Sequence, residues 1–282
     1  MTSSVATAIL AVWLVFGVTP SGRALDLAAF AGRLDASPAL HGLNAGLLNA
    51  ITATSAAAGL LGLVVIGVWR NRLAAALRAG GAVAAATVTA ELLKLTLPHA
   101  GARDQVWTWA GGGSFPSGHT TIAASMSLAL LSVSSPTWRR RLVGLLLAWT
   151  VVTSTATITM GWHRPSDVLG GLGVAALWHR VLVSDRGRGG VRTTGSTGAG
   201  GTSLSTLAIP ALWWVTATAI VLWGSSPAAA EGWAELLTTA YLVALATVAV
   251  GAVVLFVCSP VAAGERGRGP TVRRPPPLRL RS

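Results

Sequence analysis

Long apolar stretches separated by short polar segments dominate the chain. About eight of them approach the roughly 20 residues that a helix needs to cross a bilayer. They lie near Val5–Thr19, Leu47–Trp69, Leu73–Leu97, His119–Val133, Leu142–Met160, Val168–Val183, Leu207–Trp223 and Leu236–Cys258. Many are rich in Ala and Gly, which suits close contact between helices in lipid. The pattern predicts an all-α, polytopic transmembrane bundle of about eight helices.

The polar segments divide this bundle into parts. Residues 20–44 are rich in small residues and are expected to form an outer loop. Residues 185–204, rich in Gly, Ser, Thr and Arg, predict a flexible cytoplasmic linker, and residues 260–282, rich in Pro and Arg, a disordered tail. The predicted core is residues 1–184. Two further helices within residues 205–259 are expected either to pack on the bundle or to mediate a homodimer.

Composition and charge agree with a membrane protein. Hydrophobic residues make up 52% of the chain and charged residues 11%, whereas a soluble domain usually has about 25% charged residues. The net charge of +12 lies mostly on arginines in segments predicted to be cytoplasmic. This bias follows the positive-inside rule, so the charge indicates orientation and not a nucleic-acid partner. We expect a multi-pass protein of the cytoplasmic membrane, surrounded by its lipids, with both termini cytoplasmic.

The first apolar stretch could be read as a signal peptide. It has no basic segment before it and no clear small-x-small cleavage site after it, so a retained helix is expected. The single cysteine, Cys258, excludes an intramolecular disulfide.

Two polar islands interrupt the apolar pattern, Pro116–His119 and Gly161–Asp167, and upstream of both lies Lys94, the only lysine. Ionisable groups at the ends of membrane helices call for a functional explanation. With a cytoplasmic N-terminus, the third helix ends outside after Lys94, and the fourth and sixth begin outside at the islands. The crossings therefore predict that all three motifs meet at the extracytoplasmic face.

The islands have the chemistry of an anion site. Ser117 is a good N-cap, Gly118 lets a ligand approach the backbone, and Pro165 suits the first turn of a helix. Both islands are thus expected to be helix N-termini, where free N–H groups and the helix dipole favour an anion. Lys94 adds a full positive charge. Phosphate is the expected ligand.

The histidines predict reactivity toward that phosphate. His163 and Asp167 are spaced i, i+4, so the carboxylate can fix one ring nitrogen and leave the other as a nucleophile. His119 could protonate a leaving oxygen. Apart from Asp104, no second carboxylate lies nearby to build a metal site, so a route without metal or other cofactor is expected.

Simpler interpretations remain open for several of these residues. Lys94 follows Glu91 by three residues and could neutralise it within the helix. Arg164 could serve only as an anchor at lipid headgroups. His99 and Arg103 could be solvated loop residues.

Together these motifs resemble the type 2 phosphatidic acid phosphatase family, the lipid-phosphate phosphatases related to vanadium haloperoxidases, over residues 45–184. Pro-Ser-Gly-His is complete at residues 116–119, and His163 and Asp167 match the end of the third family motif. The resemblance implies that His163 is a nucleophile forming a phosphohistidine, with Asp167 as its orienting partner and His119 as the general acid. It further implies that Lys94, Ser117 and Gly118 hold phosphate oxygens.

Two departures from the family pattern concern arginines. The Ser-Arg pair of the third motif is replaced by Ala156 and Thr157, and the Arg-Pro of the first motif by Leu-Pro within residues 97–100. Arg103 and Arg164 are candidate substitutes. Losing two guanidinium groups from a phosphate site would cost several kcal/mol of charge-assisted binding.

The resulting hypothesis is an integral-membrane, metal-independent phosphatase with an extracytoplasmic active site. Polyprenyl pyrophosphate, phosphatidic acid and phosphatidylglycerol phosphate are equally compatible lipid phosphate substrates. One alternative is a phosphotransferase that passes the phosphoryl group to an acceptor other than water. The other is a degenerate lipid-phosphate binder or a transporter, although transporters tend to place ionisable groups near the bilayer midplane.

Overall fold

The structure, a computed structural model, describes residues 2–35, 38–97, 113–184 and 233–257, and these residues form helices and short connections only. This confirms the predicted all-α bundle. The longer helices are α1 (Thr2–Trp13), α2 (Pro20–Ala31), α3 (Pro38–Asn49), α4 (Ala53–Trp69), α5 (Leu73–Thr96), α6 (Gly118–Val133), α7 (Pro136–Thr159), α8 (Pro165–His179) and α10 (Trp233–Val257). Short helical turns, η1 (Leu14–Val18), η2 (Gly32–Asp35) and η3 (Arg180–Ser184), extend three of them.

Several helices have the length and apolarity of membrane spans. Among the described residues, α5, α7 and the segment Leu237–Phe256 of α10 each meet both criteria alone. The continuous helix Thr2–Val18 is 17 residues long, which lies within the range that crosses a bilayer. The protein is therefore a membrane protein. The predicted seventh helix, Leu207–Trp223, lies outside the described residues.

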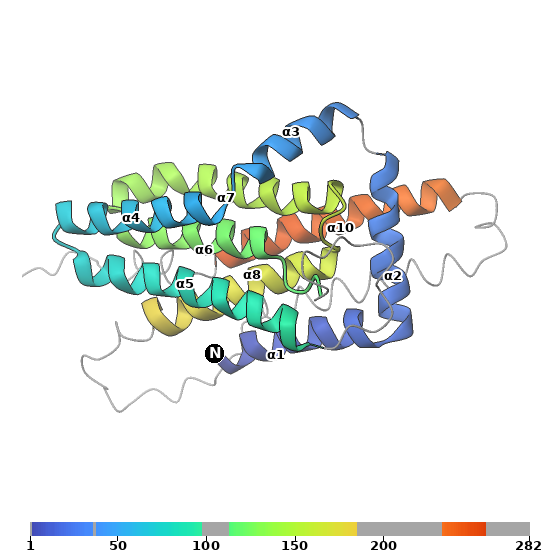
Figure 1. Cartoon of the computed structure of the whole chain (residues 1–282), viewed down its shortest axis with the longest axis horizontal. Coiled ribbons are helices and arrows are strands. Elements are labelled where there is room, and N and C mark those ends of the chain that lie inside the picture. The colour runs from blue at the N-terminus through green and yellow to red at the C-terminus, as the bar shows by residue number, and fades with distance from the viewer. Residues whose placement is uncertain (1, 36–37, 98–112, 185–232, 258–282) are drawn as a thin grey trace, which may run out of the picture.

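The prediction of an outer loop over residues 20–44 is wrong, because α2 and most of α3 occupy it. The N-terminus of α2 is well specified, since Pro20 is its first residue and Thr19 Oγ1 accepts the N–H of Gly22 at 3.1 Å. Frequent Gly and Pro obscured the helical pattern in the sequence. The axis of α2 turns 86° away from that of the preceding helix, so α2 lies across the end of the bundle (Figure 1).

Apart from α3, which is bent by 58° from α4, the remaining helices run side by side (Figure 1). Helix α5 packs on α4, α6 and α8, while α1 lies against α8. One end of the bundle, which we call the site end, carries the last turn of α5 and the first turns of α6 and α8. A backbone bond from Gly113 N to Lys94 O (3.1 Å) and another from Ser117 N to Asp167 O (2.8 Å) hold these turns together.

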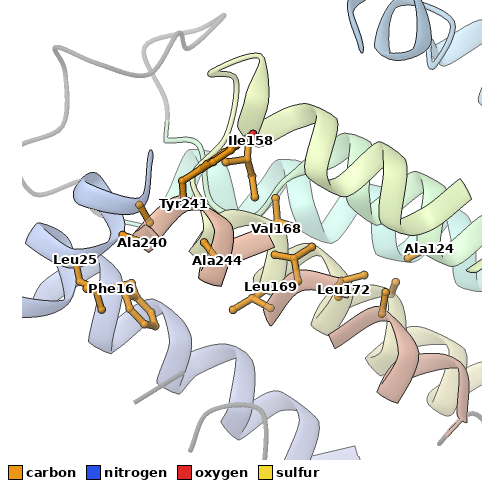
Figure 2. Close-up of a cluster of buried hydrophobic side chains, with 14 residues drawn as sticks. Phe16, Leu25, Ala124, Ile158, Val168, Leu169, Leu172, Ala240, Tyr241 and Ala244 are labelled. Carbon is orange, nitrogen blue, oxygen red and sulfur yellow. The ribbon is translucent and has the colours of Figure 1, made fainter. Parts of the chain in front are cut away.

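A buried apolar cluster joins the terminal helices to the central ones (Figure 2). Phe16 and Leu25 from the N-terminal region pack with Val168 and Leu169 of α8. The same cluster contains Ala240, Tyr241, Ala244, Val248 and Ala252 of α10. Tyr241 also shares a 2.6 Å hydrogen bond with Thr159. Helix α10 thus packs on the bundle. Helix α2 contacts both α10 and α8, whose first turn lies at the site end.

Helices α6 and α8 approach closely at Gly171. A Cβ atom there would lie 2.8 Å from the carbonyl oxygen of Ser117 and 3.1 Å from Thr121 Oγ1. Because the first of these is a backbone atom, an alanine side chain would force the two helices apart. Small residues permit this kind of contact in membrane bundles.

We therefore expect Gly171→Ala to destabilise the folded protein by about 1–3 kcal/mol, the usual cost of overpacking. The matched control is Gly144→Ala on α7, where nothing lies within 4 Å of the added Cβ. Thermal unfolding in detergent should show a lowered midpoint for Gly171→Ala alone. Equal midpoints for the two variants would contradict the close approach.

Candidate active site

The first polar island forms the N-terminus of α6. Ser117 is the N-cap, as predicted, and its side chain accepts the N–H of Thr120 at a long 3.4 Å. Its carbonyl accepts the Thr121 hydroxyl at 2.7 Å, and the residue is fully buried. The N-cap interactions leave the N–H groups of Gly118 and His119, which have no partner within the helix, facing the site end.

The second island forms the N-terminus of α8, with Pro165 as its first residue. Asp167 Oδ2 accepts the backbone N–H of Arg164 at 2.9 Å, and the Ser114 side chain also hydrogen-bonds this carboxylate. Asp167 is 2% exposed. The carboxylate therefore has a fixed position at the start of α8.

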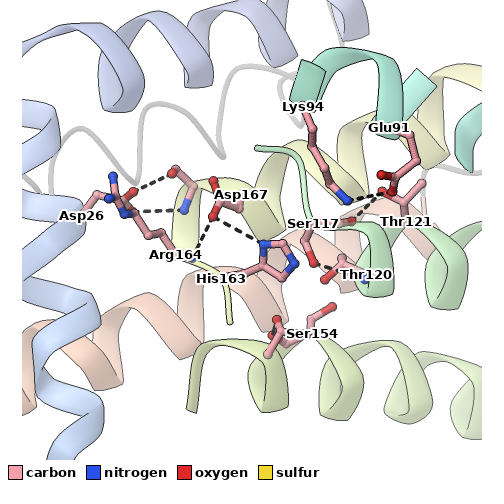
Figure 3. Close-up of polar contacts among 12 residues, drawn as sticks. Asp26, Glu91, Lys94, Ser117, Thr120, Thr121, Ser154, His163, Arg164 and Asp167 are labelled. Atoms are coloured by element: carbon pink, nitrogen blue, oxygen red, sulfur yellow. Dashed lines mark hydrogen bonds and ion pairs between the residues drawn. The ribbon is translucent and has the colours of Figure 1, made fainter. Parts of the chain in front are cut away.

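The two islands are joined directly, because the N–H of Ser117 donates to the carbonyl of Asp167 at 2.8 Å. Two helix N-termini, one from α6 and one from α8, thus lie side by side (Figure 3). The two distant segments thus lie together at one end of the bundle, as the number of crossings predicts.

The two imidazoles lie within this junction. His163 Nδ1 is 3.5 Å from Asp167 Oδ2, which is longer than an ordinary hydrogen bond. Catalytic hydrogen bonds are often this long before substrate binds. His119 packs against Trp162 with 5.3 Å between ring centroids, and it is close enough to His163 and Lys94 to interact with both electrostatically.

Lys94 reaches the same place from the last turn of α5. Its Nζ atom would lie 3.0 Å from a Cβ on Gly118, so the ammonium group sits directly over the first turn of α6. It also pairs with Glu91 Oε1 at 2.7 Å (Figure 3). The Lys94 side chain is 19% exposed and that of Glu91 57%. The neutralising contact within the helix is therefore present, and the ammonium group still faces the site.

The two arginines proposed as substitutes have different outcomes. Arg103 and His99 lie outside the described residues. Arg164 is 8% exposed, and Figure 3 shows its side chain beside Asp26, on the opposite side of Asp167 from Lys94.

Several of the buried polar atoms that have no hydrogen-bond partner lie at this junction. Within the described part of the chain, the unpartnered atoms are Thr120 Oγ1, Thr153 Oγ1, Ser154 Oγ, His163 Nδ1 and Arg164 Nε, together with Arg70 Nε, which lies at the C-cap of α4 away from the site end. Figure 3 shows Thr120 and Ser154 near the His163 ring. Unpaired buried polar groups are costly, so their concentration here indicates a site that binds a polar ligand.

Sequence reasoning missed several of these residues. The hydroxyls of Thr120 and Ser154 have no motif signal, although both are polar residues on otherwise apolar helices. Asp26 lies in the segment that was expected to be an outer loop, where no motif marked it. In the structure it is fully buried and accepts two hydrogen bonds from Ser166, one from the N–H at 3.1 Å and one from the hydroxyl at 2.6 Å.

The environment of Asp26 raises the pKa of its carboxyl group to about 7 from an ordinary 3.8. Burial is the main cause and the nearby negative charge of Asp167 adds to it, whereas the Ser166 hydrogen bonds and Arg164 act in the opposite direction. Because the folded pKa exceeds the unfolded one, the contribution of Asp26 to stability is complete below pH 3.8 and is lost as the pH rises through about 7.

Asp26→Asn removes this titration and keeps one acceptor and one donor for Ser166. We expect the thermal midpoint of the variant, relative to that of the parent, to be several degrees higher at pH 8 than at pH 5. Thermal unfolding of both proteins in detergent at the two pH values measures this difference. Groups that titrate in the same way in the parent and the variant contribute equally to both midpoints, so their effect drops out of the difference. A difference that does not change with pH would show that the Asp26 carboxyl group is not neutral in the folded state at low pH.

The described residues contain no group of three or more His, Cys, Asp and Glu side chains arranged to hold a metal ion. The described groups at the site are two imidazoles, a carboxylate, an ammonium group and two helix N-termini.

Comparison with known proteins identifies the family of the chain. The model of the PAP2 superfamily matches residues 50–189, from the loop before α4 to just beyond η3. A solved structure described as the first transmembrane PAP2-type phosphatidylglycerolphosphate phosphatase, from Bacillus subtilis, has a similar fold. The TM-score is 0.51 at 20% identity, and the match covers 68% of this chain and 98% of that one. No curated protein sequence matches the chain. The matched segment carries both polar islands and Lys94, and the chain belongs to the PAP2 superfamily.

Proposed function

We propose that the protein is an integral-membrane phosphatase that hydrolyses a lipid phosphate or pyrophosphate through a phosphohistidine at His163. The observation that carries this proposal is the junction of the two helix N-termini, with His163, His119 and Lys94 around it. Such a junction offers an anion both N–H groups and positive charge.

His163 is the nucleophile in this proposal. Its Nδ1 atom faces Asp167, so Nε2 is the nitrogen that attacks phosphorus. The bond from phosphorus to the lipid oxygen breaks, and His119 donates a proton to that oxygen. Water, deprotonated by His119, then attacks the phosphohistidine, releasing inorganic phosphate and restoring both imidazoles.

The phosphate oxygens are held by Lys94 and by the N–H groups of Gly118 and His119. The N–H of Ser117 is already used by Asp167, but its hydroxyl proton remains able to donate. Phosphoryl transfer depends mainly on such positioning and on electrostatic stabilisation.

The missing arginines of the family pattern are replaced here by neutral donors. Thr157, at the former arginine position, is buried and donates its hydroxyl to Ser154 O at 2.8 Å. The unpartnered hydroxyls of Thr120 and Ser154 lie near His163 and can donate to phosphate. Hydroxyl donors bind an anion more weakly than guanidinium groups, so we expect modest affinity for free phosphate.

The substrate enters from the lipid at the site end, which we assign to the extracytoplasmic face. The support is the concentration of arginines in the segments at the other end of the helices. Polyprenyl pyrophosphate, phosphatidic acid and phosphatidylglycerol phosphate all present a terminal phosphate at this depth.

The test is phosphate release by the detergent-solubilised full chain from these three lipids, with EDTA present. Release from at least one of them supports the proposal, and products that carry phosphate on an added alcohol would indicate a phosphotransferase instead. Binding of the lipids without release would indicate a lipid-phosphate binder. Release that requires added metal would contradict the metal-independent route.

A further inference from the structure

A carboxylate outside the family match contacts the proposed active site. Asp26 lies on α2, whereas the match begins at residue 50. Its side chain is fully buried and accepts hydrogen bonds from both the N–H and the hydroxyl of Ser166, at 3.1 and 2.6 Å. The two residues are 140 positions apart in the chain. Asp26 thereby takes up one of the free N–H groups at the start of α8.

Ser166 links this contact to the reacting groups. Its neighbour Asp167 faces His163 through its carboxylate and accepts the N–H of Ser117 at 2.8 Å through its carbonyl. A shift of Ser166 would therefore move the partner of His163 and the start of α6 together. Figure 3 shows Asp26, Asp167 and His163 in this order across the first turn of α8.

Helix α2 is held firmly enough to act as a support. Gly32, just beyond its end, packs so tightly on α10 that an added Cβ would collide with Leu237 O and Tyr241. Leu25 and Ala29 belong to the main buried cluster. Arg33 lies 3.7 Å over the Phe30 ring, and its Nε atom would lie 2.8 Å from a Cβ added at Gly161, at the start of the second island.

We propose that Asp26 is a positioning residue of the active site, which fixes the first turn of α8 so that Asp167 and His163 stay aligned with His119. Asp26 touches no substrate and acts through Ser166. The inference rests on the proposed function, because its consequence for catalysis requires that His163 be the nucleophile.

The experiment compares Asp26→Ala, Asp26→Asn and a control, Ser21→Ala, which removes an exposed hydroxyl on the same helix. Asp26→Ala leaves both groups of Ser166 unpaired. The side chain of Asp26→Asn can still accept the Ser166 N–H and can donate to its hydroxyl. Two readouts are taken on each full-length protein: hydrogen exchange of the amides of residues 166–168, and the steady-state constants for phosphate release.

We expect Asp26→Ala to speed exchange of these amides at least tenfold and to lower kcat at least tenfold, with KM within threefold of the parent. Asp26→Asn and Ser21→Ala should remain within threefold of the parent in both readouts. The split between kcat and KM separates misalignment of the reacting groups from loss of substrate binding. Expressing kcat per folded molecule separates misalignment of the reacting groups from a loss of folded protein.

Unchanged exchange in Asp26→Ala would overturn the proposal, as would faster exchange with an unaltered kcat. An equal loss in Asp26→Asn would also overturn it, because the hydrogen bonds alone would then not explain the effect. If the parent itself releases no phosphate, the proposed function fails. The exchange data still decide in that case whether Asp26 holds the first turn of α8.

Discussion

Replacing His163 with alanine is expected to reduce phosphate release at least about a thousandfold. The attacking nitrogen is lost, and a water molecule in its place is a much weaker nucleophile toward phosphorus. KM should change little, since Lys94 and the helix N-termini still hold the phosphate. The measurement is kcat and KM on whichever lipid the parent hydrolyses.

The matched control is His41→Ala on α3, which makes the same chemical change outside the site. It should leave kcat within about threefold of the parent, the range of ordinary surface substitutions. A loss of only tenfold in His163→Ala would show that His163 assists the reaction without forming the covalent intermediate.

Replacing His119 with alanine is expected to lower kcat by about 10²–10⁴-fold for a lipid monoester, the usual range for general acid catalysis. The leaving group of a monoester is an alkoxide, which needs a proton as it departs. A substrate with an easily expelled leaving group, such as a nitrophenyl phosphate, needs that proton much less. We therefore expect the His119→Ala defect to shrink at least tenfold on such a substrate.

His163→Ala should show no such recovery, because the nucleophile is needed whatever the leaving group. This contrast separates the two imidazoles by role. An equal defect of His119→Ala on both substrates would contradict its assignment as the acid and would favour a role in holding phosphate beside Lys94.

The convergence of the site could be predicted because a bundle with short connections reverses direction at every crossing. Once His119 and His163 were placed at helix ends, the number of crossings put them at the same end of the bundle. The Ser117 cap and the position of Pro165 at the start of α8 could also be predicted, because both obey the residue preferences of helix N-termini. The Glu91–Lys94 pair was visible from its spacing of three residues.

The contribution of the N-terminal region could not be predicted in this way. Helix α2 has frequent small residues and a short length, so no periodic pattern marked it. The contact of Asp26 with Ser166 spans 140 positions, and no local rule connects such residues. The direction of Arg164 was equally hidden, because a side chain at a helix start can turn either toward the phosphate site or toward α2.

These observations give the site a different charge balance from that of the family pattern. In the proposed function, one ammonium group, partly neutralised by Glu91, and two helix N-termini face the phosphate, with hydroxyls in place of a guanidinium group. With less positive charge at the phosphate, we expect the rate to depend more on the alignment of the reacting groups than it does when the family arginines are present. The rate should therefore be sensitive to the contact between α2 and α8.

A phosphoryl group caught on the enzyme during turnover is the most direct test that the imidazoles and Lys94 flank a single reacting phosphorus atom. The parent is mixed rapidly with a lipid that it hydrolyses and quenched in alkaline denaturant, where phosphohistidine survives. Its peptides are then analysed by mass spectrometry. We predict one phosphoryl group on His163, formed within a single turnover and absent from His163→Ala. Phosphate release with the phosphoryl group on another residue, or with no phosphorylated residue at any time, would contradict the account.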